Sequence, residues 1–251
     1  MVKLSSEFLE FLAARQTLLS SLGTDGCDKP SLPSLSDLSK QLGVSVSLLR
    51  EQLEVAKALG FVEVRPRTGI RCLPYAFSPA VSQSLSYAIA IDWNHFITYY
   101  DLRNHLEAAY WDESARKLTT DDRDALDQLV RLAWQKLRGQ PIQIPHAEHR
   151  QLHLMIYCRL GNPFVLGLLE AFWEAYESVG LNLYADYEYL QQVWTYHQQM
   201  VEAICQERYQ EGFRAFELHR NLLFHRPQPI VKDKDILIKD PNPRKDIPYT
   251  N

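Results

Sequence analysis

The chain contains 251 residues, of which 46% are hydrophobic and 23% are charged, a composition typical of a soluble globular protein with one or two domains. Its net charge of −4 excludes a general polyanion-binding protein, so any contact with nucleic acid requires a local basic surface. No apolar run approaches the roughly 20 residues that cross a bilayer. Four scattered cysteines without a CxxC spacing indicate reduced thiols in a cytoplasmic protein that does not enter a membrane.

The N-terminal segment predicts one amphipathic helix over residues 1–23. Glu7 and Glu10 interrupt its apolar residues, which excludes a signal peptide. A loop rich in Gly, Asp, Pro and Ser follows from Gly23 to Pro33, and it separates this helix from the next periodic stretch.

Residues 34–60 predict two short helices joined by a tight turn. Ser34 can cap the first helix with Asp37 as its capping-box partner, and Gly43 can end it because glycine adopts the left-handed conformation without steric cost. Ser45 can cap the second helix, which ends at Gly60. The inward side of the second helix consists of apolar residues at helical spacing, namely Leu49, Leu53, Ala56 and Leu59. The outward side consists of Val46, Arg50, Glu54 and Lys57.

A small hairpin is predicted next, with strands at residues 61–64 and 70–73 and a turn at 66–69. Arg65, Arg67 and Arg71 give this hairpin a basic surface. Two helices joined by a turn and followed by a hairpin form a winged helix-turn-helix, which we assign to residues 1–73. In such a motif the second helix enters the major groove of DNA.

The remaining chain has helical periodicity and little strand signal. Residues 74–79 form a linker, and residues 80–226 are expected to form a bundle of about seven helices. The breaks between these helices are placed near Asp92, Thr119–Asp122, Gly139–Pro145, Gly161–Pro163, Gly180–Ala185 and Glu211–Gly212. The tail at 227–251 is polar and proline-rich, which predicts an extended segment. The fold class is therefore mainly α.

The order LPSLSDLSKQLGVS followed by LLREQLEVAKALGFVEVRPRTGIRC resembles the N-terminal domain of the GntR family of bacterial transcription regulators. Residues 80–226 resemble the FadR-type ligand-binding and dimerisation domain of that family, called FCD. Four stretches carry this second resemblance, namely DLRNHLEAA (101–109), HRQLHLMIYCRLGNP (149–163), TYHQQMVEAI (195–204) and RAFELHR (214–220). The resemblance implies a homodimer that binds a palindromic double-stranded DNA operator.

The resemblance also implies that the second helix and the hairpin contact DNA, through Ser45, Ser47, Arg50, Arg65, Arg67, Thr68 and Gly69. The chain departs from the family at Val46, where members usually carry an arginine, and at Ser36 in the preceding helix. Val46 cannot grip guanine as an arginine does, although it can contact a thymine methyl group. An alternative role for Arg50 is an ion pair with Glu54 on a solvated helix face.

Two histidines four residues apart, His149 and His153, present both imidazoles on one helix face. His197 and His219 lie in stretches that resemble the metal-binding positions of the family, where one Asp and three His are usual. His149 stands at the aspartate position, so the implied ligands are four histidines. Neutral imidazoles favour zinc or nickel over manganese. The alternatives are hydrogen-bonded core histidines and a site that has lost its metal.

Arg103 lies where the resemblance implies an anchor for the carboxylate of a small organic acid effector. A guanidinium matches a carboxylate in two hydrogen bonds, and Phe96, Tyr99 and Tyr110 share its helix stripe. The alternative is a surface ion pair with Glu107, one turn away.

These features predict a repressor-type transcription regulator whose operator affinity responds to the effector, and not an enzyme. One alternative is a metal-dependent hydrolase or isomerase that uses the histidines, although no HExxH or similar pattern is present. Another is a degenerate paralogue that dimerises without binding DNA, which Val46 and Ser36 suggest.

Overall fold

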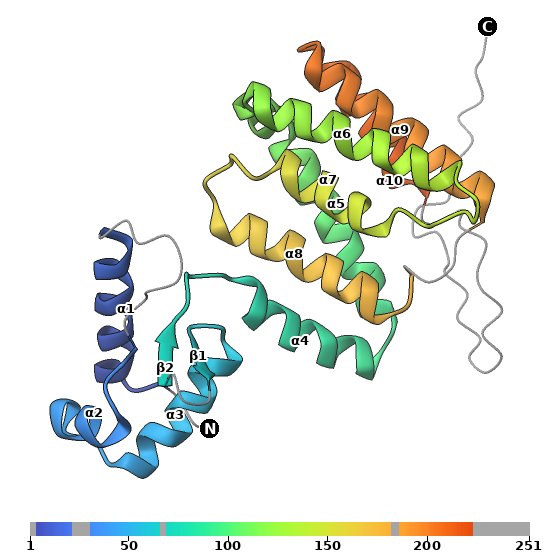
Figure 1. Ribbon diagram of the computed structural model, residues 1–251. Coiled ribbons are helices and arrows are strands. Elements are labelled where there is room, and N and C mark those ends of the chain that lie inside the picture. The colour runs from blue at the N-terminus through green and yellow to red at the C-terminus, as the bar shows by residue number, and fades with distance from the viewer. Residues whose placement is uncertain (1–3, 22–30, 66–68, 182–185, 223–251) are drawn as a thin grey trace, which may run out of the picture. The chain divides into compact units, whose positions relative to one another are not determined.

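The computed structural model describes residues 4–21, 31–65, 69–181 and 186–222 (Figure 1). Within these ranges the chain is mainly helical, with a single antiparallel pair of strands, which confirms the predicted fold class. None of the described helices is both long enough and apolar enough to span a bilayer. The predicted tail at 227–251 lies outside the described residues.

The chain divides into two compact units. The first comprises Met1–Arg103 and Gly161–Ala175, and the second comprises Asn104–Leu160 and Tyr176–Asn251. Two helices, α5 (Asn94–Lys117) and α8 (Pro163–Ser178), contribute residues to both units. The domain boundaries at residues 73, 80 and 226 stay predictions.

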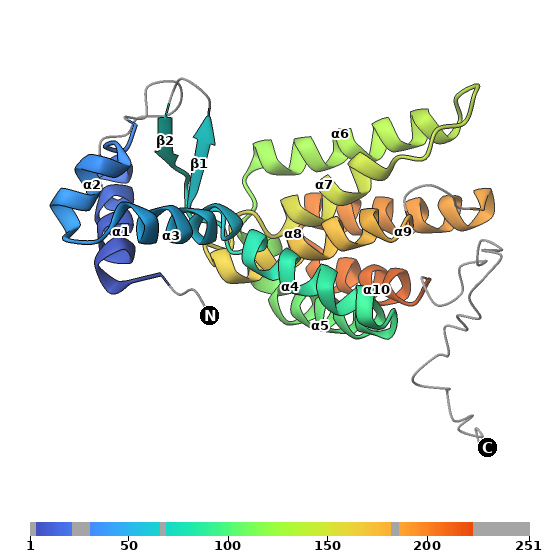
Figure 2. The same ribbon diagram turned by 90° about the horizontal axis from the view of Figure 1, so that it is seen from below.

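The winged helix-turn-helix of the first unit consists of five elements, namely α1 (Ser6–Ser21), α2 (Leu35–Leu42), α3 (Val46–Ala58), β1 (Val62–Arg65) and β2 (Gly69–Cys72). The strands pair with Val62 opposite Cys72 and Arg65 opposite Gly69. Figure 2 shows both strands beside α3, in the position of a wing. The order and type of these elements agree with the sequence-based prediction.

Local hydrogen bonds explain where α2 and α3 begin and end. The hydroxyl of Ser34 accepts the Asp37 N–H at 3.2 Å, and Gly43 ends α2 in the left-handed conformation with a φ of 67°. The hydroxyl of Ser45 accepts the Leu48 N–H at 3.2 Å. These caps satisfy backbone groups that a helix terminus leaves without partners, and they confirm the predicted caps.

The core of this motif joins all five elements, because its buried residues come from each of them: Phe8, Leu12, Leu32, Leu38, Leu49, Leu53, Ala56, Val62, Ile70 and Cys72. Three of the four residues predicted for the inward side of α3 are among them. Leu59 is only half-buried, because it forms the C-cap of α3. Gln52 is buried instead, and its side-chain oxygen accepts a hydrogen bond from Ser5 at 3.2 Å.

Seven further helices occupy the described part of the remaining chain, in agreement with the predicted number: α4 (Ser78–Ile91), α5 (Asn94–Lys117), α6 (Thr120–Leu137), α7 (His146–Ile156), α8 (Pro163–Ser178), α9 (Tyr187–Cys205) and α10 (Tyr209–Arg220). In the second unit α9 packs against α6 and α10, and α7 packs against α6 (Figure 1). This arrangement positions the histidine-bearing helices as neighbours.

One predicted helix break is wrong. Glu211 and Gly212 lie inside α10, and the chain turns earlier, at Gln206–Arg208, where Glu207 has a φ of 58°. Gly212 serves packing instead, because a Cβ at this position would lie 2.9 Å from the Trp111 ring.

Asp122 ties the start of α6 to a neighbouring segment. Its carboxylate accepts hydrogen bonds from Arg159 at 2.8 and 3.0 Å and from the Thr119 N–H at 2.9 Å. The Arg159 guanidinium, followed by the Thr119 N–H, holds the pKa of Asp122 well below its ordinary value. The carboxylate is therefore ionised at neutral pH and completes the capping box that begins α6.

In the first unit, the segment before α4 lies directly against α8. A Cβ at Gly167 would lie 2.7 Å from the Phe77 Cβ and 2.8 Å from the Ser78 backbone nitrogen. The Phe77 and Phe164 rings stack edge-to-face with their centres 5.3 Å apart. Only a residue without a side chain permits this approach.

Candidate functional site

Three helices of the second unit bring four histidines into one cluster. His149 and His153 come from successive turns of α7, His197 comes from α9, and His219 comes from the last turn of α10. One ring nitrogen of each lies within 4.8 Å of one ring nitrogen of every other. His149 is half-buried, and the other three are buried. Residues separated by up to 70 positions thus meet in one small volume.

The spacing of these nitrogens suits a metal ion. The Nε2 atoms of His153 and His197 are 3.1 Å apart, close to the roughly 3.0–3.4 Å expected between adjacent ligands when each nitrogen lies about 2.0–2.1 Å from the ion. Two ligands of one ion can be at most about 4.2 Å apart on the same basis. The widest pair of the cluster, at up to 4.8 Å, would therefore close slightly on binding. The donor set and its spacing fit a divalent transition metal.

A buried carboxylate stands behind His153. Glu107 on α5 is fully buried, and its Oε1 lies 3.0 Å from the His153 Nδ1. The Tyr157 hydroxyl donates to the Glu107 backbone carbonyl at 2.9 Å. Glu148, which neighbours His149 in the sequence, accepts a hydrogen bond from Lys136 at 2.6 Å instead.

Arg103 on α5 is buried, with an exposed fraction of 3%. In the first unit its guanidinium carbon lies 4.9 Å from the ring centre of Phe172 and 5.7 Å from that of Trp173. Arg103 and Glu107 are both buried, so the surface location of the alternative ion pair between them is wrong.

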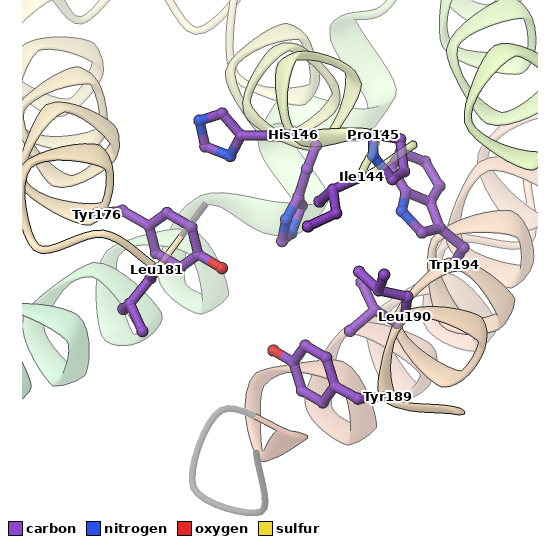
Figure 3. A pocket seen from close by; sticks show the side chains of 10 residues that line it. Ile144, Pro145, His146, Tyr176, Leu181, Tyr189, Leu190 and Trp194 are labelled. Atoms are coloured by element: carbon purple, nitrogen blue, oxygen red, sulfur yellow. The ribbon is translucent and has the colours of Figure 1, made fainter. Parts of the chain in front are cut away.

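A small pocket of the second unit opens beside His149, and its volume of about 20 Å³ is enough for roughly one water molecule. The side chains that line it are mostly apolar or aromatic: Ile144, Pro145, His146, His149, Tyr176, Leu181, Tyr189, Leu190, Val193 and Trp194. Figure 3 shows the hydroxyl groups of Tyr176 and Tyr189 on the pocket side of their rings. His149 thus borders both the pocket and the cluster.

Three of the residues predicted to contact DNA lie at or near the start of α3. Ser45, Ser47 and Arg50 are all exposed. Glu54, the alternative partner of Arg50, pairs with Lys57 at 2.7 Å, and no ion pair within the described residues involves Arg50.

The wing carries the others. Arg65 and Gly69 are exposed at the ends of the two strands. Arg65 pairs with Glu63 at 3.0 Å. Arg67 and Thr68 lie outside the described residues, so their predicted DNA contacts have no structural description.

Comparison with known proteins identifies the larger part of the helical region. Residues 98–221 match the FCD domain family. Streptococcus agalactiae GntR has a similar structure, with a TM-score of 0.62 and 19% identity over 86% of this chain and 98% of that one. Residues 98–221 form an FCD domain. The structure of E. coli McbR/YncC matches less well, with a TM-score of 0.44 and 18% identity over 88% of this chain and 96% of that one. A search of curated proteins finds no match.

The FCD match places the cluster inside the family domain. All four histidines, Arg103 and Glu107 fall within residues 98–221.

Proposed function

We propose that this protein is a GntR-family regulator, namely a homodimeric DNA-binding repressor whose operator affinity is controlled by a small carboxylate effector bound in a metal-containing FCD domain. The observation that carries this proposal is the cluster of four imidazoles whose ligand atoms lie within 4.8 Å of one another. Four imidazole nitrogens that converge in this way are a donor set typical of a divalent transition metal.

The ligand chemistry supports zinc or nickel rather than manganese. All four candidate ligands are nitrogen donors, and imidazole suits zinc, copper, iron and nickel better than the harder ions that prefer oxygen. A bound divalent ion would hold an anionic oxygen of the effector through its positive charge. The cluster itself would supply the nitrogens, from His149, His153, His197 and His219.

Arg103 supports a carboxylate effector on separate grounds. Its charge is buried against two aromatic rings, where an ion pair with a ligand is screened less by water than at the surface. A guanidinium also fixes the orientation of a carboxylate through paired hydrogen bonds.

The exposed outward side of α3 supports DNA binding. Arg50 is the one basic residue there that no described acidic residue neutralises, since Lys57 pairs with Glu54. In a dimer, two such helices would enter successive major grooves, and this geometry requires a palindromic site.

Fluorescence anisotropy with labelled duplex DNA from upstream of the protein's own gene tests this proposal. We expect Arg50→Ala to weaken binding by about 5- to 150-fold, the equivalent of about 1–3 kcal/mol for a base-reading arginine. Arg131→Ala is the matched control, because Arg131 is an exposed arginine on α6 and its removal changes net charge equally. Absence of DNA binding at low salt, with and without zinc, would refute the proposal. Equal DNA affinity of wild type and Arg50→Ala would show that the DNA bases are not contacted by Arg50 of α3.

Effector control is tested on the same complex with zinc-loaded protein. Titration with acetate, lactate and succinate should change DNA affinity by about 5- to 150-fold for an effective acid. Arg103→Ala should reduce that response while leaving effector-free DNA binding unchanged. A response that Arg103→Ala retains in full would remove Arg103 from the effector site.

A further inference from the structure

Glu107 is a buried acidic residue in contact with a candidate ligand but outside the ligand set. The four mutually close ligand atoms all belong to histidines, whereas the Glu107 carboxylate lies behind His153, at the nitrogen that does not face His197. Its Oε1 is 3.0 Å from Nδ1, while Nε2 of the same ring is 3.1 Å from the His197 Nε2. The His153 ring therefore connects the carboxylate to the cluster.

This contact decides which nitrogen of His153 carries the proton. A neutral imidazole has one N–H donor and one lone-pair acceptor. The Glu107 carboxylate oxygen lies at hydrogen-bond distance from Nδ1, and this contact favours the tautomer in which Nδ1 donates the N–H. Nε2 then has its lone pair directed toward the cluster, which is the form that binds a metal ion.

The Glu107 carboxylate would also offset part of the positive charge of a bound metal ion. Four neutral imidazoles leave both positive charges of a divalent ion without compensation, and an uncompensated buried charge is costly. Glu107 supplies one negative charge a single ring away from the ion. The Glu148 carboxylate instead bonds the Lys136 ammonium group at 2.6 Å.

We infer that Glu107 is a positioning residue for the metal centre, which holds the His153 proton on Nδ1, directs Nε2 to the ion and supplies the negative charge that the four ligands lack. This inference rests on the proposed metal centre and assigns a role to a residue outside the ligand set. The backbone of Glu107 is itself fixed by the Tyr157 hydroxyl, so the carboxylate is held in place by the fold.

The first test compares zinc affinity, measured by competition with a chromophoric chelator, in the full-length protein and three variants. Glu107→Gln keeps the size of the side chain and removes its charge, and Glu107→Ala removes both. We expect affinity losses of about 10-fold for Glu107→Gln and up to about 100-fold for Glu107→Ala, the range usual for residues that hydrogen-bond a metal-binding histidine. Glu148→Gln is the matched control, because it removes a buried carboxylate from α7 that faces Lys136, and it should stay within a few-fold of wild type.

The second test measures two spectroscopic properties that would not change if Glu107 only stabilised the fold. In the cobalt-loaded protein, Glu107→Gln should shift the visible absorption bands, whereas Glu148→Gln should not. In metal-free wild type, nitrogen-15 NMR should show His153 protonated on Nδ1. This measurement needs no variant, so it decides the matter even if a Glu107 variant fails to fold.

The outcomes separate this inference from the proposed function. Equal zinc affinity in wild type and both Glu107 variants, an equal loss in Glu148→Gln, or a His153 proton on Nε2 would overturn the role of Glu107 alone. Failure of wild type to bind zinc, nickel or cobalt would overturn the metal centre and this inference with it. Metal binding that depends on Glu107, in a protein that does not bind DNA, would leave the inference intact and refute the proposed regulator.

Discussion

Replacement of His197 tests the metal centre most directly. This residue is fully buried, and its Nε2 faces the Nε2 of His153 at 3.1 Å. A metal ion that binds only the folded protein stabilises it by RT ln(1 + [M]/Kd), about 2.7 kcal/mol at a free concentration 100 times Kd. We therefore expect zinc to raise the melting temperature of metal-free wild type, and His197→Gln to lose most of that rise.

The size of the rise follows from the length of the unfolding unit. The entropy of unfolding is about 2.1 cal/mol/K per residue. If residues 98–221, which are 124 residues, unfold together, 2.7 kcal/mol corresponds to about 10 °C. If all 251 residues unfold together, it corresponds to about 5 °C. A variant with 100-fold weaker binding would retain only about 0.4 kcal/mol, a rise of about 1–2 °C.

Differential scanning calorimetry of chelator-stripped protein, with and without zinc, measures this effect. His146→Gln is the control, because His146 lies on α7 with two of the ligands but bonds Glu177 at 3.0 Å and stacks on Tyr176. It should show the full rise. The reasoning is refuted if zinc and nickel leave the wild-type melting temperature unchanged, or if His197→Gln responds like wild type.

Three further predictions concern stability and reactivity. Gly167→Ala should destabilise the protein by about 1–3 kcal/mol in urea unfolding, because the new Cβ would overlap the backbone beside Phe77 and overpacking outweighs the roughly 1 kcal/mol gained in helix propensity. Asp122→Asn should lower the melting temperature at pH 7. Since Arg159 depresses the folded-state pKa of Asp122, its stabilisation is present above about pH 4 and is lost below it, so the two melting temperatures should converge in acid. The Cys72 thiol is buried, whereas Cys158 and Cys205 are exposed, so mass spectrometry should find Cys72 alkylated by iodoacetamide more slowly than these two.

The local structure of the winged helix-turn-helix was predictable because each of its helix ends depends on residues that are close together in the sequence. Each cap of α2 and α3 depends on a side chain within three residues of the backbone group it satisfies, as Ser34 and Ser45 show. The conformation of Gly43 likewise follows from its own lack of a side chain. Such features do not depend on where distant segments lie.

The error at Gly212 has the opposite cause. Glycine commonly marks a helix end, but this one faces Trp111, which is about 100 residues earlier in the chain. The helix starts at Tyr209, after a turn through Glu207, a residue with no strong turn preference. Only the tertiary packing of α10 distinguishes these two possibilities.

The histidine cluster was predictable only in part from the spacing of its residues. The four-residue spacing of His149 and His153 predicts a shared helix face, but periodicity alone could not bring His197 and His219 to it. The family resemblance grouped them, and the structure brings all four together.

From the sequence, Glu107 had no role beyond that of an alternative surface partner of Arg103, because an acidic residue four positions after an arginine is typical of an exposed helix pair. The spacing of Glu107 from other residues of the same helix nevertheless indicated that it is buried. Phe96, Arg103 and Glu107 are separated by seven and four residues, which places all three on one helix face, and all three are buried. A buried face that carries two opposite charges indicates that these residues serve something other than solubility.

The charge of the proposed centre also bears on the effector it would accept. A divalent ion with four neutral imidazoles retains two positive charges, and the Glu107 carboxylate would offset one of them. The Arg103 guanidinium of the proposed effector site adds another positive charge, so two would be left for a ligand. A dicarboxylate would neutralise both, whereas a monocarboxylate would leave one uncompensated. Succinate should therefore stabilise the zinc-loaded protein more than acetate at equal concentration in a thermal-shift titration, and Arg103→Ala should reduce or reverse that preference. A preference for acetate in wild type would mean that Arg103 does not contribute its charge to the site and that this count of charges is wrong.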